Sequence, residues 1–358
     1  MAAPNASPTV AGGANIAASA RTVSNDQTLF LKKWSGEFHN AYQVELNISK
    51  TIARHSISGA KSYQWPINSR ATAGPKAPGV YTIGDDAIRF NEQEIFVDRS
   101  TYAEHFVDNV DELHAHYDIR SPIIQEQARA LARYDEDKAL GALSQAAALD
   151  APDGMTYIDP EDGTTDYGLA ANRATANVLT GITTMAALRA SDFSVLAGLI
   201  ADQHTRYYNL GIDPYQAMLI LDPQTYMAFK RSTEGQKLID RDLNAEAGYD
   251  YRNVPIPTTY GIKIVKSTNW LGYIDKAAAN TPLNGDASLH RNTYNPNNTD
   301  VAGLFYTPQS AGCLDLHGLQ VTASREELVD SLLLRHKITN GYGPLRPETC
   351  FPLKLDTP

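Results

Sequence analysis

One stretch of the sequence limits the choice of fold more than any other. It runs from His116 to Asp150 and reads HYDIRSPIIQEQARALARYDEDKALGALSQAAALD. Ser121 followed by Pro122 is a helix-start signal, and nothing breaks the chain from Ile123 to Gly141. Apolar residues then recur near the 3.6-residue helical period at Ile124, Ala128, Leu131, Ala132, Ala139, Leu143 and Ala147. The pattern predicts a helix from Pro122 to Leu149, a rod of roughly 40 Å at 1.5 Å per residue.

The other faces of this expected helix are strongly charged. The charged residues are Glu126, Arg129, Arg133, Asp135, Glu136, Asp137 and Lys138, and we expect them to remain solvated. The apolar stripe is narrow and rich in alanine, which lets a helix lie close to a flat partner such as a sheet. The pattern indicates a strut and not the wall of a binding pocket.

Alternating apolar residues predict strands on both sides of this helix. Val44, Leu46 and Ile48 alternate at the strand period of two, and so do Tyr63, Trp65 and Ile67. The segment RATAGPKAPG follows, and alternation resumes at residues 88–90, which together predict a long hairpin. Arms of about 12 residues would reach on the order of 40 Å. An isolated hairpin buries too little to be stable in water, so this one needs another molecule to lie on.

The remaining expected elements are shorter. They are, in chain order, a helix over residues 28–38, a helix from Ser191 to Asn209 ended by Gly211, a strand from Met218 to Leu221 followed by a helix after Asp222-Pro223, a strand from Ile262 to Val265, a polar loop over residues 277–299, and C-terminal strands interrupted by Gly341, Gly343 and Pro344. The first twenty residues carry no charge and no sustained apolar run, so they indicate a flexible arm and not a secretion signal.

Composition excludes several classes of protein. The chain has 358 residues and a formal net charge of -10, which disfavours nonspecific attraction to nucleic acid or to an anionic membrane. No apolar run approaches the roughly 20 residues that span a bilayer. The two cysteines, Cys313 and Cys350, form no metal or redox motif. One disulfide is compatible with this count, but a reduced cytoplasm fits it better.

No motif marks a catalytic, cofactor-binding or metal-binding site. His114 and His116 lie two positions apart, and on a helix they point to different faces and cannot share one metal ion. An acidic loop supplies carboxylates without the spacing of a calcium loop, at Asp150, Asp153, Asp159, Glu161, Asp162 and Asp166. The stretch Gly59-Ala60-Lys61-Ser62 lacks the glycine pattern of a phosphate loop, and no Gly-x-Ser-x-Gly elbow is present. We therefore expect no enzyme activity, no cofactor and no metal.

Three segments resemble the major capsid proteins of tailed bacteriophages, the Hong Kong 97 fold, in its podovirus form. FVDNVDELHAHYDIRSPIIQEQARALARYDEDKALGALSQAA is similar to the region that leads into and forms the family's spine helix. ADQHTRYYNLGIDPYQAMLILDPQTYMAF is similar to the helix, strand and Pro-led turn of the axial domain. NGYGPLRPETC resembles the family's C-terminal Gly-x-x-Leu-Arg-Pro-Glu signature.

The resemblance implies an α+β fold with five parts. These are an N-terminal arm (1–50), an extension loop (51–107), a peripheral domain with the spine helix (108–190), an axial domain (191–312), and C-terminal strands that return to the peripheral domain (313–358). It also implies self-assembly into the pentamers and hexamers of an icosahedral head that encloses double-stranded DNA. Such a protein assembles in the host bacterial cytoplasm and ends in the virion.

The resemblance also implies partners. The short, uncharged start leaves no room for a scaffolding segment, so a separate scaffolding protein is expected, with a portal at one vertex, an optional decoration protein, and no membrane. Lys61 and Lys76 lie in the expected extension loop, but no motif carries the namesake's lysine-to-asparagine links over to them, so we expect a noncovalent shell. A near-neutral or acidic inner wall is expected, since many phosphate contacts would hinder packaging of the genome.

Contacts between subunits are expected in the extension loop. The candidates are Arg70, Lys76, Tyr81, Asp85, Asp86 and Arg89, and exposed charge pairs of this kind typically give less than about 1 kcal/mol each. Two alternatives stay open at this point: the shell protein of an encapsulin-like cellular compartment, and a metal-dependent enzyme that uses the acidic loop with His114 or His116.

Overall fold

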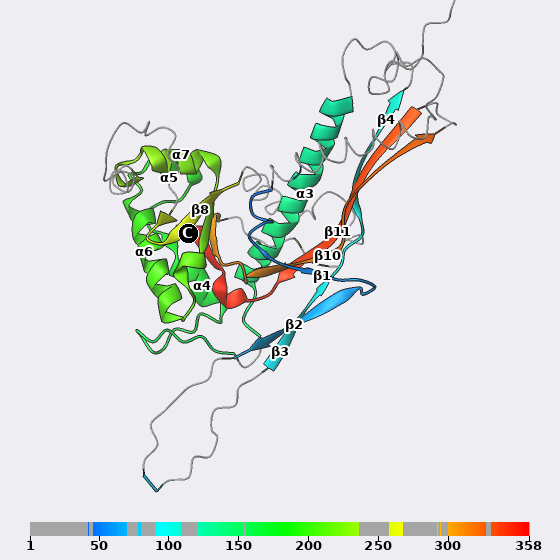
Figure 1. Cartoon of the computed structure of the whole chain (residues 1–358). Helices are drawn as coiled ribbons and strands as arrows, with labels where there is room; N and C mark the ends of the chain where they lie inside the picture. The colour runs from blue at the N-terminus through cyan, green and yellow to red at the C-terminus, as the bar shows by residue number, and fades with distance from the viewer. Residues whose placement is uncertain are drawn as a thin grey trace, which may run out of the picture.

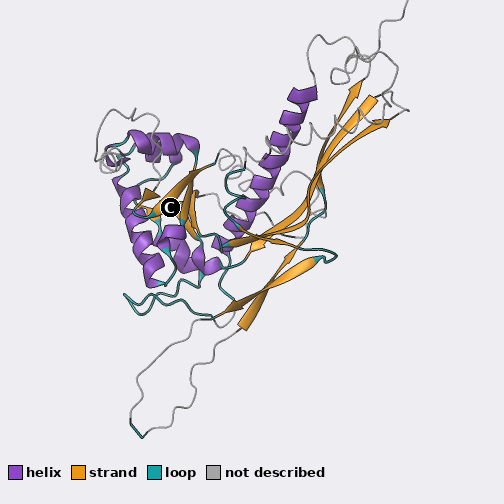
Figure 2. Cartoon of the chain, in the orientation of Figure 1, coloured by secondary structure: helices purple, strands orange, loops and turns teal. Residues whose placement is uncertain are grey.

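The long helix forms as expected and stands at the centre of the molecule (Figure 1). The computed structural model describes residues 42, 46–69, 78–79, 90–108, 120–152, 155–235, 258–267, 292, 294, 300–326 and 331–357. Helix α3 spans Arg120–Ala148, so it begins two residues before Pro122. At 29 residues it is about 43 Å long. On one side of α3 lies a lobe of short helices around a sheet, and on the other a set of long strands (Figure 2).

The apolar stripe of α3 is buried along its whole length, as its sequence predicted. The first half contributes Ile124, Ala128, Leu131 and Ala132 to one core cluster, together with Leu334 and Ile338 from the long strands. The second half contributes Ala139, Leu143 and neighbouring alanines to another cluster, which also holds Tyr306 and Tyr342. Small side chains let the helix lie close to both partners, so α3 joins the two lobes.

A four-stranded sheet packs against the first half of α3. Its order is β1-β10-β11-β4, formed by Ala53–Ser56, Ala311–Glu326, Ser331–Pro344 and Thr101–Asp108. β1 runs parallel to β10, and the other neighbours are antiparallel. The pairing of β10 with β11 shifts register between Asp315 and Gln320, which marks bulges that bend the strand pair.

A six-stranded mixed sheet forms the core of the helical lobe. Its order is β5-β12-β9-β6-β8-β7, formed by Val178–Leu179, Phe351–Leu355, Val301–Tyr306, Met218–Leu221, Ile262–Lys266 and Thr258–Thr259. The helices of this lobe are α4 Ala170–Ala176, α5 Met185–Ala190, α6 Ser194–Asn209 and α7 Pro223–Arg231, with short 3-10 turns at Pro214–Gln216 and Pro347–Thr349. The expected domain limits at residues 190 and 313 do not coincide with a change of sheet, because β5 and β12 both belong to this one.

Local sequence explains the strand-to-helix turn in this lobe. The strand predicted at Met218–Leu221 is confirmed as β6 and is almost fully buried. Asp222 then caps α7, because its carboxylate accepts hydrogen bonds from the backbone N–H groups of Gln224 and Thr225, and Pro223 takes the first helical position. The helix predicted from Ser191 begins at Ser194, since Phe193 has a left-handed backbone with φ of 62° and separates it from α5.

The predicted hairpin is present as β2 Ser62–Asn68 paired with β3 Phe90–Phe96. Its base crosses β11 closely. A Cβ atom on Gly341 would lie 2.0 Å from the carbonyl oxygen of Phe96, and one on Gly343 would lie 2.9 Å from Ile95 Cγ1. The expectation that these glycines interrupt the terminal strands is therefore wrong for both. They lie within β11, where the missing side chains leave space for β3.

The strand predicted through Val44, Leu46 and Ile48 is wrong over its described part, because residues 46–52 form turns against α3. The helix expected over 28–38 and nearly all of the loop expected over 277–299 lie outside the described residues. Among the described helices, none is long and apolar enough to cross a membrane.

Candidate functional site

Four consecutive charged residues in the middle of α3 are buried. Asp135, Glu136, Asp137 and Lys138 are between 1% and 7% exposed, so the expectation that they remain solvated is wrong. Successive residues of a helix point about 100° apart, and burial of all four means that other segments surround the helix here. Buried charges are costly unless they are paired and hydrogen-bonded. The partners of these side chains therefore show which segments the helix holds.

Asp135 joins the turn that precedes β1 to the end of the long strands. Its carboxylate accepts hydrogen bonds from the hydroxyls of Tyr42 at 3.0 Å, Ser49 at 3.2 Å and Tyr342 at 2.9 Å, and from the side-chain amide of Asn340. Burial, and next the charge of Asp135, raise the pKa values of Tyr42 and Tyr342 far above the usual range. Both hydroxyls therefore stay neutral donors.

The side chain of Glu136 binds the backbone of the same turn. The carboxylate accepts hydrogen bonds from the backbone N–H groups of Asn47, Ile48 and Ser49 at 2.7, 3.0 and 3.1 Å. Burial raises the pKa of Glu136 to about 7, against the lowering effect of these three bonds. These contacts give residues 47–49 a turn where their apolar pattern predicted a strand.

Lys138 points to the base of the hairpin. Its Nζ atom lies 3.7 Å from Asp98 Oδ2, and it donates hydrogen bonds to Thr101 and Asn340 at 3.2 Å each. Its ammonium group also lies 5.4 Å from the centre of the Tyr134 ring. Asp98 follows β3 by two residues, so this pair links the hairpin to the helix.

Tyr294 closes the cluster from a distant part of the chain. Its hydroxyl donates to Asp98 at 2.5 Å and accepts the backbone N–H of Tyr342 at 2.9 Å. Its Cβ would be 3.0 Å from a Cβ atom placed on Gly141 of α3. Glycine in a helix interior costs about 1 kcal/mol relative to alanine, and here it provides the room in which Tyr294 packs.

A buried arginine connects the C-terminal end of α3 to α4. The guanidinium of Arg173 is fully buried and donates to the carbonyl oxygens of Ala146 and Leu149 at the end of α3, and to those of Tyr167 and Gly168. A positive charge is favourable at a helix C-terminus, where backbone carbonyls lack partners. α3 has no basic residue in its own last turn, so this charge comes from outside the helix.

The arrangement is suited to holding segments of the chain together. Carboxylates of the cluster are bonded to donors of the protein itself, which come from Tyr42, residues 47–49, Lys138, Tyr294, Asn340 and Tyr342. Within the described residues, no group of three or more His, Cys, Asp or Glu side chains is placed to hold a metal ion. Cys313 and Cys350 are both free and buried.

Carboxylates of the acidic loop bind the loop's own backbone. Asp162 accepts from the N–H groups of Thr164 and Thr165, and Asp166 accepts from those of Tyr157 and Gly168.

Asp153, His114 and His116 lie outside the described residues, as do all six contact candidates, Arg70, Lys76, Tyr81, Asp85, Asp86 and Arg89. The structure therefore does not place the residues that the sequence selected, and the buried cluster that it does show was missed. Four adjacent charges inside an alanine-rich helix were the only signal for it.

A family model and curated relatives match most of the chain. The family model described as Gp10A-like major capsid protein matches residues 64–354. The chain is 24% identical to the major capsid protein of Escherichia phage T7 over 334 residues, which is 89% of this chain and 90% of that protein. It is 23% identical to the major capsid protein of Enterobacteria phage T3 over 357 residues, covering 94% of each.

Solved structures give the same fold. The capsid structure of the cyanophage P-SCSP1u matches with a TM-score of 0.64 and 23% identity, covering 88% of this chain and 89% of that one. The mature capsid of bacteriophage PhiM1 matches with a TM-score of 0.58 and 18% identity, covering 86% of each. These likenesses confirm the expected α+β fold of the Hong Kong 97 type. Since the family model covers most of the chain, the protein belongs to the Gp10A-like family of major capsid proteins and is a structural component of a phage virion.

Proposed function

We propose that copies of this chain form the pentamers and hexamers of an icosahedral phage head, with the hairpin of each copy lying on a neighbour. The observation that carries this proposal is the hairpin itself. One face of β2 and β3 packs on the chain's own body, and the other, with Phe90 78% exposed, faces solvent. A two-stranded ribbon is marginally stable alone, and a partner on its open face stabilises it.

The two sheets suggest how a subunit is divided within such a shell. The four-stranded sheet with the first half of α3 would form the peripheral domain, and the six-stranded sheet with α4 to α7 the axial domain. This division places β12 with the axial domain, whereas the sequence-based division placed residues 313–358 with the peripheral domain. Contacts of one copy with a different patch of the next close into rings when the rotation permits it.

The buried cluster would fix the geometry of the subunit in this shell. Residues 47–49, the hairpin base at Asp98 and the strand β11 are all bonded to one turn of α3. A shell repeats the same angles between parts in many copies, so small variations in the angle of the hairpin would disturb every contact. Buried, mutually bonded polar groups restrict such variation, because any shift leaves a buried group unpaired.

The proposed head also requires proteins other than this chain. A separate scaffolding protein, a portal at one vertex and an optional decoration protein would complete a head that encloses DNA without reading its sequence, assembled in the host cytoplasm. The loop residues Arg70, Lys76, Tyr81, Asp85, Asp86 and Arg89 stay candidates for contacts between copies. A cellular compartment and a metal-dependent enzyme are not favoured, because the matching family and curated relatives are phage capsid proteins.

Electron microscopy tests this proposal. The protein is expressed alone and together with the gene that lies upstream of its own, and the particles are imaged after purification. Closed shells with five-fold and six-fold rings are expected in at least one of the two preparations. Only monomers in both would overturn the proposal.

A further inference from the structure

One buried site brings an amine next to a side-chain amide of the same chain. Nζ of Lys138 in α3 donates a hydrogen bond to Oδ1 of Asn340 in β11, at 3.2 Å. Lys138 is 1% exposed and Asn340 is fully buried. The carbon Cγ of Asn340 is one bond of about 1.2 Å from Oδ1, so Nζ lies within about 4.4 Å of the carbon that an amine attacks. A shift of about 1 Å brings Nζ to the separation at which such groups react.

Two buried carboxylates each contact one member of this pair. Oδ2 of Asp98 lies 3.7 Å from Nζ of Lys138, and Asp135 accepts a hydrogen bond from Nδ2 of Asn340. An ionised carboxylate can only accept hydrogen bonds, so Asp135 fixes the amide with its nitrogen towards itself and its oxygen towards the lysine. The site therefore has a base beside the amine and an acceptor beside the nitrogen of the amide.

Neighbouring side chains hold this arrangement in place. Tyr294 donates a hydrogen bond to Oδ2 of Asp98 at 2.5 Å, and Asn292 donates one to Oδ1 of the same carboxylate at 3.2 Å. Asp98 is 4% exposed and Asp135 is 1% exposed. Burial restricts the access of water, which would otherwise compete for the amide, and fixed neighbours raise the effective concentration of the amine at the carbonyl carbon.

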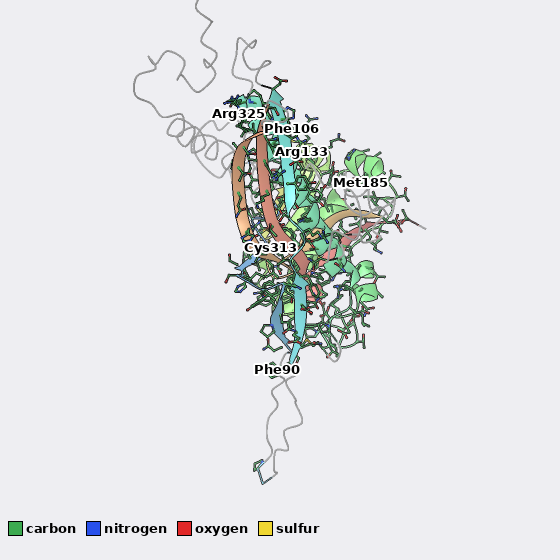
Figure 3. The ribbon with its side chains drawn as sticks, turned by 90° about the vertical axis from the view of Figure 1, so that its right-hand side faces the viewer. Phe90, Phe106, Arg133, Met185, Cys313 and Arg325 are labelled. Atoms are coloured by element: carbon green, nitrogen blue, oxygen red, sulfur yellow. The ribbon has the colours of Figure 1, made fainter. Side chains whose placement is uncertain are left out.

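The site lies inside one copy of the chain. Asn340 is two residues from Tyr342, which pairs with Cys313 of β10. Figure 3 shows Cys313 in the middle of the molecule, between Phe106 near the upper end and Phe90 at the lower end of the described hairpin. A reaction between the lysine and the asparagine therefore joins two segments of one subunit, and it joins no copy to another.

We propose that Lys138 and Asn340 of each copy form a covalent amide bond between their side chains after the chain has folded. Nζ gives one proton to Asp98, and its free electron pair then forms a bond with Cγ of Asn340 while the carbonyl pair moves onto Oδ1. A second proton passes from Nζ to Nδ2, the carbonyl re-forms, the bond between Cγ and Nδ2 breaks, and ammonia leaves. The third proton stays on Nζ as the N–H of the new amide. No oxidant, reductant or cofactor is consumed.

The reaction leaves no unpaired charge in the buried site. The ion pair of Lys138 with Asp98 is the starting state in a newly folded subunit, and afterwards Asp98 carries the proton while the nitrogen is neutral. The new bond joins residues 202 positions apart, so it limits the freedom of the unfolded chain and thereby stabilises the folded one, as a disulfide does. Each copy reacts once, so the step is a modification of the chain and not the turnover of a substrate.

Intact-mass measurement of the purified full-length chain tests the proposal. After prolonged incubation at neutral pH, the wild-type chain is expected to weigh less than its sequence by the mass of one ammonia molecule. Digestion with trypsin should then give a branched peptide that joins residues 134–173 to residues 338–354, because trypsin does not cleave after a lysine whose nitrogen is acylated. Fragmentation of this peptide should locate the branch at Lys138 and Asn340.

Three substitutions test the roles of the side chains. Lys138→Arg keeps the positive charge but removes the amine, and this variant is expected to keep the full mass of its sequence. Asp98→Asn removes the base and should slow the loss of ammonia by about a hundredfold or more. Lys263→Arg, on an exposed lysine of β8, is the matched control and should lose ammonia as the wild type does.

The branched peptide separates this reaction from another that releases ammonia, the cyclisation of Asn340 onto the backbone nitrogen of Gly341. Full mass in the incubated wild type, loss of ammonia without the branched peptide, or an equal loss in Lys138→Arg overturns the proposal. The masses are measured on denatured chains, whether or not these had assembled, so none of these outcomes bears on the proposed function.

Discussion

The ammonium group of Lys138 lies 3.7 Å from the carboxylate of Asp98, and each side chain is only 1% exposed. The two residues belong to different elements, the middle of α3 and the segment just after the hairpin. Their pairing means that the position of the hairpin and the stability of the subunit depend on the same buried contact.

Replacing Lys138 by methionine is expected to destabilise the subunit strongly. The substitution removes the ammonium group from the buried ion pair with Asp98, and breaking one side of a buried pair typically costs about 3–5 kcal/mol. Urea unfolding of the unassembled subunit measures the change. Arg129→Ala, which removes the exposed pair with Glu126, is the control and should cost less than about 1 kcal/mol. Similar losses for both variants would show that the buried Lys138 pair contributes no more to the free energy of unfolding than the exposed pair.

Glu136 is expected to make stability fall as pH rises towards neutrality. Its pKa in the folded subunit is about 7, above the ordinary value of 4.5, so the folded state binds the proton more tightly. The resulting stabilisation is fully present below pH 4.5 and is lost as pH rises through 7, at up to about 1.4 kcal/mol per pH unit. The free energy of unfolding of wild type and Glu136→Gln is measured from pH 4.5 to 8. The difference between them should decrease with pH, and a constant difference would contradict the assignment.

Arg173→Ala is expected to loosen the junction between α3 and α4. Its guanidinium is fully buried and bonds four backbone carbonyls, so its removal leaves several of them without a donor, at about 1–3 kcal/mol for each group left unsatisfied. Thermal unfolding of the subunit reports the loss. Arg173→Lys keeps the charge with fewer fixed donors and should lie between. Lys263→Ala on the exposed side of β8 should change stability by less than about 0.5 kcal/mol.

Gly341→Ala is expected to impair both folding and shell formation. The new methyl group would meet the carbonyl oxygen of Phe96, so β3 must move away from β11 and carry the hairpin with it. Gly318→Ala is the matched control, because nothing lies within 4 Å of the added atom. The yield of shells and the melting temperature of the subunit are compared for the two variants. Equal behaviour would show that the hairpin does not depend on this close crossing.

Local patterns predicted those parts of the fold that depend on local physics. The apolar spacing and the Ser121-Pro122 start located α3 within two residues at each end, and the alternation at Tyr63 to Ile67 located β2. Asp222-Pro223 marked the start of α7, since a side-chain cap and a proline act within one turn. These signals lie within a few residues of the structure that they specify.

Local sequence patterns did not predict the candidate site. A charged side chain on a helix is usually solvated, and nothing near Asp135 or Lys138 in the sequence shows what surrounds them. Their partners Tyr42 and Asn340 lie 93 and 202 or more positions away, and Asp98 belongs to another element. Gly341 is a similar case. Its glycine was interpreted as an interruption of the strand, because the residue that it makes room for, Phe96, lies far upstream in the sequence.

The sequence by itself determined a long alanine-striped helix, a projecting hairpin and the order of elements that marks a phage capsid protein. Only the tertiary structure decided that four charges on that helix are buried, and that the base of the hairpin and β11 surround them. The physical reason is that helix period, capping and alternation act between neighbours in the chain. Burial and pairing depend on which distant segments the completed fold brings together.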